Sequence, residues 1–85
     1  MSDPRTADRD LADAIASEVP ALLRTARALT RNPHDAEDLV QDTVARGLER
    51  GSTFRGDSSL RHWLRRIMHH LAVDRFVDHR AAGGK

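Results

Sequence analysis

Three stretches of this chain place an apolar residue at every third or fourth position, a spacing that an α-helix brings onto one face. They run from about residue 8 to 30, from 33 to 50 and from 58 to 77. No stretch alternates apolar and polar residues as a half-buried strand does, and the chain has no tyrosine. The pattern therefore predicts an all-α fold, a compact bundle of three to four helices forming one domain.

Proline, glycine and short polar residues predict where the helices begin, bend and end. Pro20 lies inside the first stretch, where it should kink the helix or divide it into two abutting helices. Asn32 is expected to cap the second helix, with a proline at the first helical position. Gly51 should end that helix in a left-handed conformation, and Asp57 or Ser58 should cap the third.

The apolar stripes also predict which side chains fill the core. Trp63 should flank the third stripe, and Phe54 in the loop before it should cover the core. The stripe residues are Leu11, Ile15, Val19, Leu22, Ala26 and Leu29, then Ala36, Leu39, Val40, Thr43, Val44 and Leu48, then Leu60, Leu64, Ile67 and Leu71.

Composition excludes several classes of function. The chain has no cysteine, which excludes disulfides and thiolate metal sites. It has no apolar run of membrane-spanning length, and its polar N-terminus is unlike a signal peptide, so we expect a cytoplasmic protein without a membrane partner. His62 and His69 lie two helical turns apart, roughly 10 Å along the axis, too far to share one metal ion. No nucleophile with a base and no phosphate-binding glycine loop is recognisable, so we expect neither catalysis nor a cofactor.

Charge is distributed unevenly along the chain. Residues 1–50 hold seven arginines against ten acidic residues, whereas residues 51–85 hold seven basic residues against three acidic ones. This division fits a basic partner for the first part and a phosphate backbone for the second. On charge alone, two solvated faces are the favoured interpretation.

A more specific indication comes from three motifs in sequence. The run 32–44, NPHDAEDLVQDTV, is followed by FRGDSSLRHWLRRI at 54–67 and LAVDR at 71–75. In this order and at these separations, they resemble region two of the extracytoplasmic-function sigma factors. The resemblance implies a sigma region 2 domain over residues 1–80, a flexible tail over 81–85, and no region 4.

The resemblance also implies a function and partners. Region two of such a factor docks on the clamp helices of the RNA polymerase β′ subunit, melts the promoter minus-ten element and captures its single-stranded non-template strand. An anti-sigma factor is a third expected partner. An alternative function is a decoy domain that binds an anti-sigma factor without reading DNA. Because a decoy does not need a basic face, the basic third stretch favours the DNA-binding function.

Two groups of residues carry these expectations. Asp38 and Asp42, four residues apart on one helix, repel each other by roughly 0.3 kcal/mol, which a basic partner would relieve. In the family, the position of His70 usually holds asparagine and is associated with base reading. The expected polymerase-binding residues are Asp38, Gln41, Asp42 and Arg46. The expected DNA-binding residues are Arg55, Gly56, Asp57, Ser58 and Ser59 in the loop and His62, Arg65, Arg66, His69 and His70 on the third helix.

Overall fold

Three helices make up most of the computed structural model, which describes residues 4–56 and 58–78. They are α1 (Pro4–Leu29), α2 (Pro33–Glu49) and α3 (Leu60–Ala72). A 3₁₀ turn, η1 (Gly51–Thr53), follows α2, and a π-helical segment, η2 (Val73–Asp78), extends α3. No strand occurs in these ranges, which confirms the all-α bundle. The predictions for Asp57 and the tail 81–85 fall outside the described residues.

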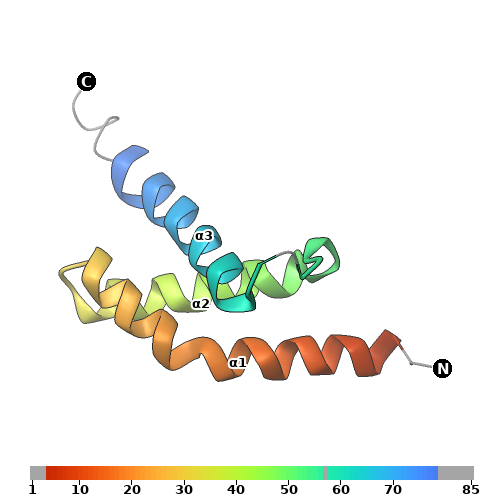
Figure 1. Cartoon of the computed structure of the whole chain (residues 1–85). Coiled ribbons are helices and arrows are strands. Elements are labelled where there is room, and N and C mark those ends of the chain that lie inside the picture. The colour runs from red at the N-terminus through yellow and green to blue at the C-terminus, as the bar shows by residue number, and fades with distance from the viewer. Residues whose placement is uncertain (1–3, 57, 79–85) are drawn as a thin grey trace.

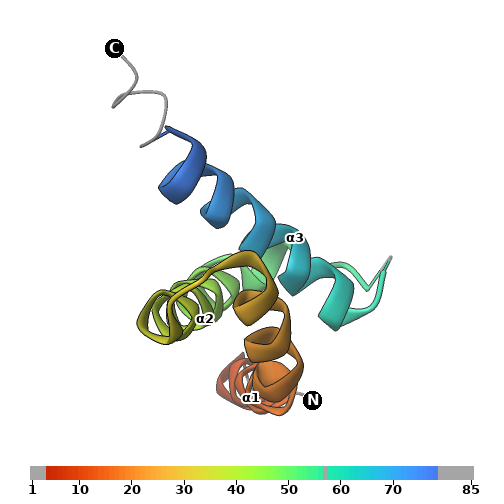
Figure 2. The same cartoon turned by 90° about the vertical axis from the view of Figure 1, so that its left-hand side faces the viewer.

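The helices α1 and α2 form an antiparallel pair, and α3 crosses it (Figures 1 and 2). The two helices run in opposite directions because only a short turn, Thr30–Asn32, separates them. Each of the three helices contacts the other two. None of the described helices is both long enough and apolar enough to cross a membrane.

The helix α1 continues through Pro20 as a single element. Figure 1 shows its axis changing direction within the orange part of the ribbon. A proline inside a helix lacks the N–H that would bond four residues back and its ring crowds that turn, which accounts for a bend. The kinked single helix is therefore the correct one of the two expected alternatives.

Polar residues cap the N-termini of α2 and α3. The cap of α2 is the expected residue, and the cap of α3 is a different one. Asn32 caps α2, its side-chain oxygen accepting a hydrogen bond of 2.8 Å from the backbone N–H of His34. The cap of α3 is Ser59, whose hydroxyl accepts from the backbone N–H of His62 at 3.1 Å. The prediction of Ser58 was wrong by one residue, because the helix begins at Leu60 and its cap must precede it directly.

Gly51 does not take the left-handed conformation that was expected of it. The C-terminal cap of α2 is Arg50, with φ −99° and ψ 13°, and Gly51 opens the 3₁₀ turn. A Cβ atom at Gly51 would collide with the side chain of Leu11 from α1. The glycine thus leaves room for the Leu11 side chain where α1 packs against the end of α2. The glycine with positive φ in the described chain is Gly56, at 79°.

The core lies where the three helices meet. One polar residue, Thr43, is fully buried in this core. Its hydroxyl donates to the Leu39 carbonyl oxygen at 2.7 Å, so its hydrogen-bonding group is satisfied. The largest fully buried apolar side chains are Ile15, Leu22, Leu39, Leu64 and Met68.

Several core predictions were wrong in detail. Leu29 is exposed because it is the last residue of α1, and Leu48 is 47% exposed because it projects from α2 away from the other two helices. Leu60 and Leu71 are partly buried and pack against the core, as expected. Met68 and Ala72 are also buried in α3, so the buried stripe is turned toward these positions.

Candidate nucleic-acid interface

The solvent-exposed side of α3 carries arginine and histidine side chains. On a helix with 3.6 residues per turn, the basic residues of α3 project opposite its buried Leu64, Ile67 and Met68. They are spread over more than two turns, and all are exposed: His62, Arg65, Arg66, His69 and His70. The structure thus brings together every residue that the sequence predicted for DNA binding on this helix.

The loop before α3 is anchored by an aromatic pair. The rings of Phe54 and Trp63 lie 5.1 Å apart between centroids, at an angle of 47°. Trp63 in turn packs against the core, so the partly buried Phe54 is linked to the core through the Trp63 ring. This contact fixes the start of the loop beside the basic face of α3.

After Phe54 in the sequence, the loop exposes polar groups to solvent. Arg55 and Gly56 are exposed, Ser58 is half-buried and Ser59 is exposed. A Cβ at Gly56 would meet no atom within 4 Å, so its positive φ, not lack of space, favours glycine there. Apart from Asp57, which the structure does not describe, the predicted loop residues lie together at the N-terminal end of the basic helix.

The exposed face of α2 carries acidic and amide groups. Asp38, Gln41 and Asp42 are all exposed and lie opposite the buried stripe of that helix. The exposed Leu48 lies on the same side, at helical spacing from Gln41. Sequence reasoning placed Leu48 in the core and so missed it as a surface residue.

Arg46 does not share this exposed face. It is partly buried at the border of α2 that faces α3, where it lines a hollow together with Arg50 and His70. The four residues predicted to bind polymerase are therefore separated: three lie on the acidic face of α2, and Arg46 lies beside the basic helix. No sequence signal marked Arg50, because an arginine at the end of a helix also suits the helix dipole.

Among the described side chains, two ion pairs connect one helical segment to another. Arg61 Nε donates to Glu18 Oε2 at 2.6 Å, which links α3 to α1. Arg75 in η2 pairs with Asp42 of α2, so one member of the acidic face already has a basic neighbour. Asp74, the neighbour of Arg75, is exposed and forms no ion pair with the described residues.

Metal coordination finds no support in the geometry of the described ranges. No three histidine, aspartate or glutamate side chains come close enough together there to hold an ion. The exposed side chains of the two faces can form hydrogen bonds and ion pairs.

Comparison with known proteins identifies this arrangement. The family model for sigma-70 region 2 matches residues 14–82. The chain is 50% identical over 46 residues to "ECF RNA polymerase sigma factor SigG" of Mycobacterium tuberculosis, a match covering 54% of the chain and 12% of that protein. It is 42% identical over 45 residues to "RNA polymerase sigma factor YlaC" of Bacillus subtilis, covering 53% and 26% respectively. No solved structure matches significantly.

Proposed function

Because the chain belongs to the sigma-70 region 2 family, the domain of a sigma factor of transcription initiation, we propose that it docks on RNA polymerase and reads the promoter minus-ten element. The observation that carries the proposal is the separation of charge. One fold presents a basic face on α3 and an acidic face on α2. Such a pair of surfaces suits two partners held at once, one polyanionic and one basic.

DNA binding rests on the basic face of α3. Arg65 and Arg66 supply charge for phosphate groups, and a guanidinium can also bond to guanine. His62, His69 and His70 can donate or accept hydrogen bonds at base edges. Because these groups stand on one rigid helix, they can follow a strand for several nucleotides.

The loop supplies groups for a base taken out of the stack. Arg55 provides a cation, Gly56 a bare backbone, and Ser58 a short hydroxyl close to both. The Ser59 hydroxyl accepts from the His62 N–H, which leaves its own O–H free to donate to a base. Unstacking a base costs a few kcal/mol, so these contacts must stabilise the unstacked base by a similar free energy.

Polymerase docking rests on the acidic face of α2. Asp38 and Asp42 repel each other along the helix, and a basic partner surface relieves this repulsion. Gln41 adds an amide between them, and the exposed Leu48 adds an apolar contact at the same side of the helix. We assign this face to the clamp helices of the β′ subunit.

The proposal gives the chain a binding role and no catalytic step, and it places the chain in the cytoplasm with polymerase and chromosome. An anti-sigma factor fits the same scheme, since covering either charged face would silence the domain. The matched segments cover 12% and 26% of the two relatives' own lengths, so the partners of a whole sigma factor are proposed for this chain.

The experiment that tests this function is fluorescence anisotropy on single-stranded non-template oligonucleotides with randomised minus-ten sequences, with and without a β′ clamp-helix fragment. We expect sequence-selective binding that the fragment strengthens. Binding of the clamp fragment without any DNA preference would instead support the decoy function.

The docking face is tested by the double variant D38K/D42K, which should lose clamp-fragment binding while its DNA binding is retained. The variant D10K/D13K makes the same change of charge on the exposed side of α1 and is the control. Clamp binding that survives D38K/D42K would refute the assignment of this face.

A further inference from the structure

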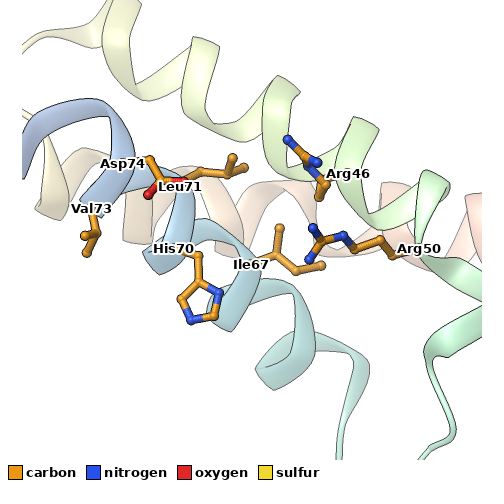
Figure 3. Close-up of a pocket in the computed structure, with 7 residues that line it drawn as sticks. All are labelled: Arg46, Arg50, Ile67, His70, Leu71, Val73 and Asp74. Carbon is orange, nitrogen blue, oxygen red and sulfur yellow. The ribbon is translucent and has the colours of Figure 1, made fainter. Parts of the chain in front are cut away.

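A groove runs between α2 and α3, beside the basic face of α3. It consists of two adjoining hollows of about 370 and 170 Å³, which share Arg50, Ile67 and His70 in their walls. Figure 3 shows that one wall comes from α2, with Arg46 and Arg50, and the other from α3 and its continuation. Arg50 extends from α2 toward Ile67 across the space between the helices (Figure 3).

The chemistry of the groove divides into a cationic rim and an apolar floor. Arg46, Arg50 and Arg66 bring three guanidinium groups to its walls. Ile67, Leu71 and Trp63 supply apolar and aromatic surface between them. The larger hollow alone has the volume of a small-molecule site, for which about 300 Å³ is the lower end of the usual range.

Arg46 of α2 and its C-cap Arg50 have no acidic partner among residues 9–56 and 58–75. Arg46 and Arg50 are four residues apart, so they are neighbours on the helix surface and repel each other. Proximity to the negative end of the helix dipole offsets part of this repulsion. An anion held between the two guanidinium groups would offset it more completely.

Asp74 is the acid in the lining, and it lies at the other end of the groove from Arg50 (Figure 3). The two ends of the groove therefore carry opposite charge. The arginine end attracts an anion, and the Asp74 end repels one. A carboxylate at that end can still accept hydrogen bonds from the amino group of a base.

The groove is also continuous with the basic face of α3. Arg66 and His70 are exposed on that face and line the groove as well. A strand lying along the face thus reaches the groove without crossing an acidic or apolar barrier. A duplex would offer only its phosphates and would leave the apolar floor empty, whereas an unstacked single strand uses both.

We infer that the groove between α2 and α3 binds one nucleotide of a single DNA strand, with its phosphate between Arg46 and Arg50 and its sugar and base on Ile67, Leu71 and Trp63. This inference rests on the proposed DNA-binding function and extends it beyond α3 and the loop. It also assigns Arg46 to the nucleic-acid surface and removes it from the polymerase surface.

The test measures anisotropy of a labelled single-stranded non-template oligonucleotide with the full chain over a series of salt concentrations. The variant R46A/R50A should bind roughly tenfold more weakly at low salt, as expected for losing a charged hydrogen-bonded contact. Its salt slope should fall by about 0.7, because one phosphate is no longer neutralised. R46K/R50K keeps both charges and should keep the wild-type slope, whereas D74N should tighten binding.

Two further variants separate this inference from the proposed function. R24A removes an exposed arginine of α1 outside the groove and should bind DNA like the wild type. R65A weakens DNA binding through the basic face alone. If R65A weakens DNA binding and R46A/R50A does not, the groove inference is wrong and the proposed function stands. If the wild-type chain binds no single strand, or if neither variant changes binding, both are wrong.

A last outcome concerns the polymerase. If R46A/R50A binds DNA like the wild type but loses the β′ clamp-helix fragment, the groove inference is overturned and Arg46 returns to the polymerase surface. Circular dichroism of each variant establishes that the helices are intact. The altered side chains lie on the surface or its border, so we expect unchanged spectra.

Discussion

At the scale of single residues, short polar side chains fix the positions from which the functional groups project. Ser59 caps α3 and accepts from the backbone of His62, the first residue of the basic face. Asn32 caps α2 in the same way, ahead of the acidic face. Phe54 holds the loop to Trp63. Each contact is local, and each sets where a charged surface begins.

The cap of α3 gives a prediction at this scale. Ser59→Ala should lower the free energy of unfolding by about 1 kcal/mol, since a helix N–H loses its side-chain acceptor. Ser58→Ala is the matched control and should change it by less than about 0.5 kcal/mol. Urea denaturation of the three proteins measures the difference; an equal loss in both variants would contradict the assignment of the cap.

His70 gives a second prediction among single residues. It is exposed at the junction of the basic face and the groove, and the family resemblance led us to expect a base-reading role at this position. His70→Asn should change base preference more than overall affinity, because the two side chains differ in shape and in the placement of their donors. Selection from randomised minus-ten oligonucleotides measures the preference; altered affinity with an unaltered motif would count against a reading role.

At the scale of helices, α2 and α3 each divide into a buried stripe and a charged face. The face of α3 is basic and the face of α2 is acidic, and the groove lies along the border between the two helices. The Arg75–Asp42 ion pair crosses from η2 to this acidic face. The side chain of Asp42 is 49% exposed, so solvent screens the pair and its contribution to stability is small.

This ion pair leads to a prediction about docking. If polymerase uses Asp42, Arg75 competes with the polymerase for the same carboxylate. Arg75→Ala should therefore tighten clamp-fragment binding by at most about fivefold, the equivalent of a surface pair worth up to about 1 kcal/mol. Titration of the labelled clamp fragment measures this, with Arg61→Ala as the control that breaks the other ion pair. Weaker clamp binding in Arg75→Ala would show that Arg75 itself contacts the partner.

At the scale of the whole molecule, one small core holds both charged faces in place. Leu64 from α3 is fully buried, and its side chain lies against the backbone of Gly47 in α2: a Cβ there would come within 2.8 Å of Leu64 Cδ2. Ile15 from α1 reaches the same point. The relative position of the acidic and basic faces, and the groove between them, therefore depends on this contact.

The contact of Leu64 with Gly47 leads to a prediction: removing the Leu64 side chain should weaken clamp binding and DNA binding together. Leu64→Ala should destabilise the fold by about 2–5 kcal/mol, a large part of the stability of a small domain, and should weaken clamp and DNA binding together. Leu48→Ala removes an equal side chain from the surface, so it should leave unfolding nearly unchanged and weaken only clamp binding. Thermal unfolding and the two binding assays compare the variants; selective loss of one function in Leu64→Ala would argue against a shared core.

Much of this molecule follows from local sequence. Helical spacing predicted three helices, Asn32 predicted the start of α2, and the basic residues of α3 were expected on one exposed face. These features depend on residues within four positions of one another, so a one-dimensional pattern contains them. The family resemblance likewise depends on motifs along the chain, and the match over residues 14–82 confirmed it.

Other features depend on which helices meet and were decided by the tertiary structure. Gly51 was expected to supply a positive φ, but it provides space for Leu11 of another helix. Leu48 was expected in the core and is exposed, while Met68 is buried. Arg46 was grouped with the acids of its own helix, yet it lines a groove with His70 of α3. The sequence determined the faces of each helix, because those repeat locally; the crossing of α1, α2 and α3 decided what each face meets, because it brings together residues that are distant along the chain.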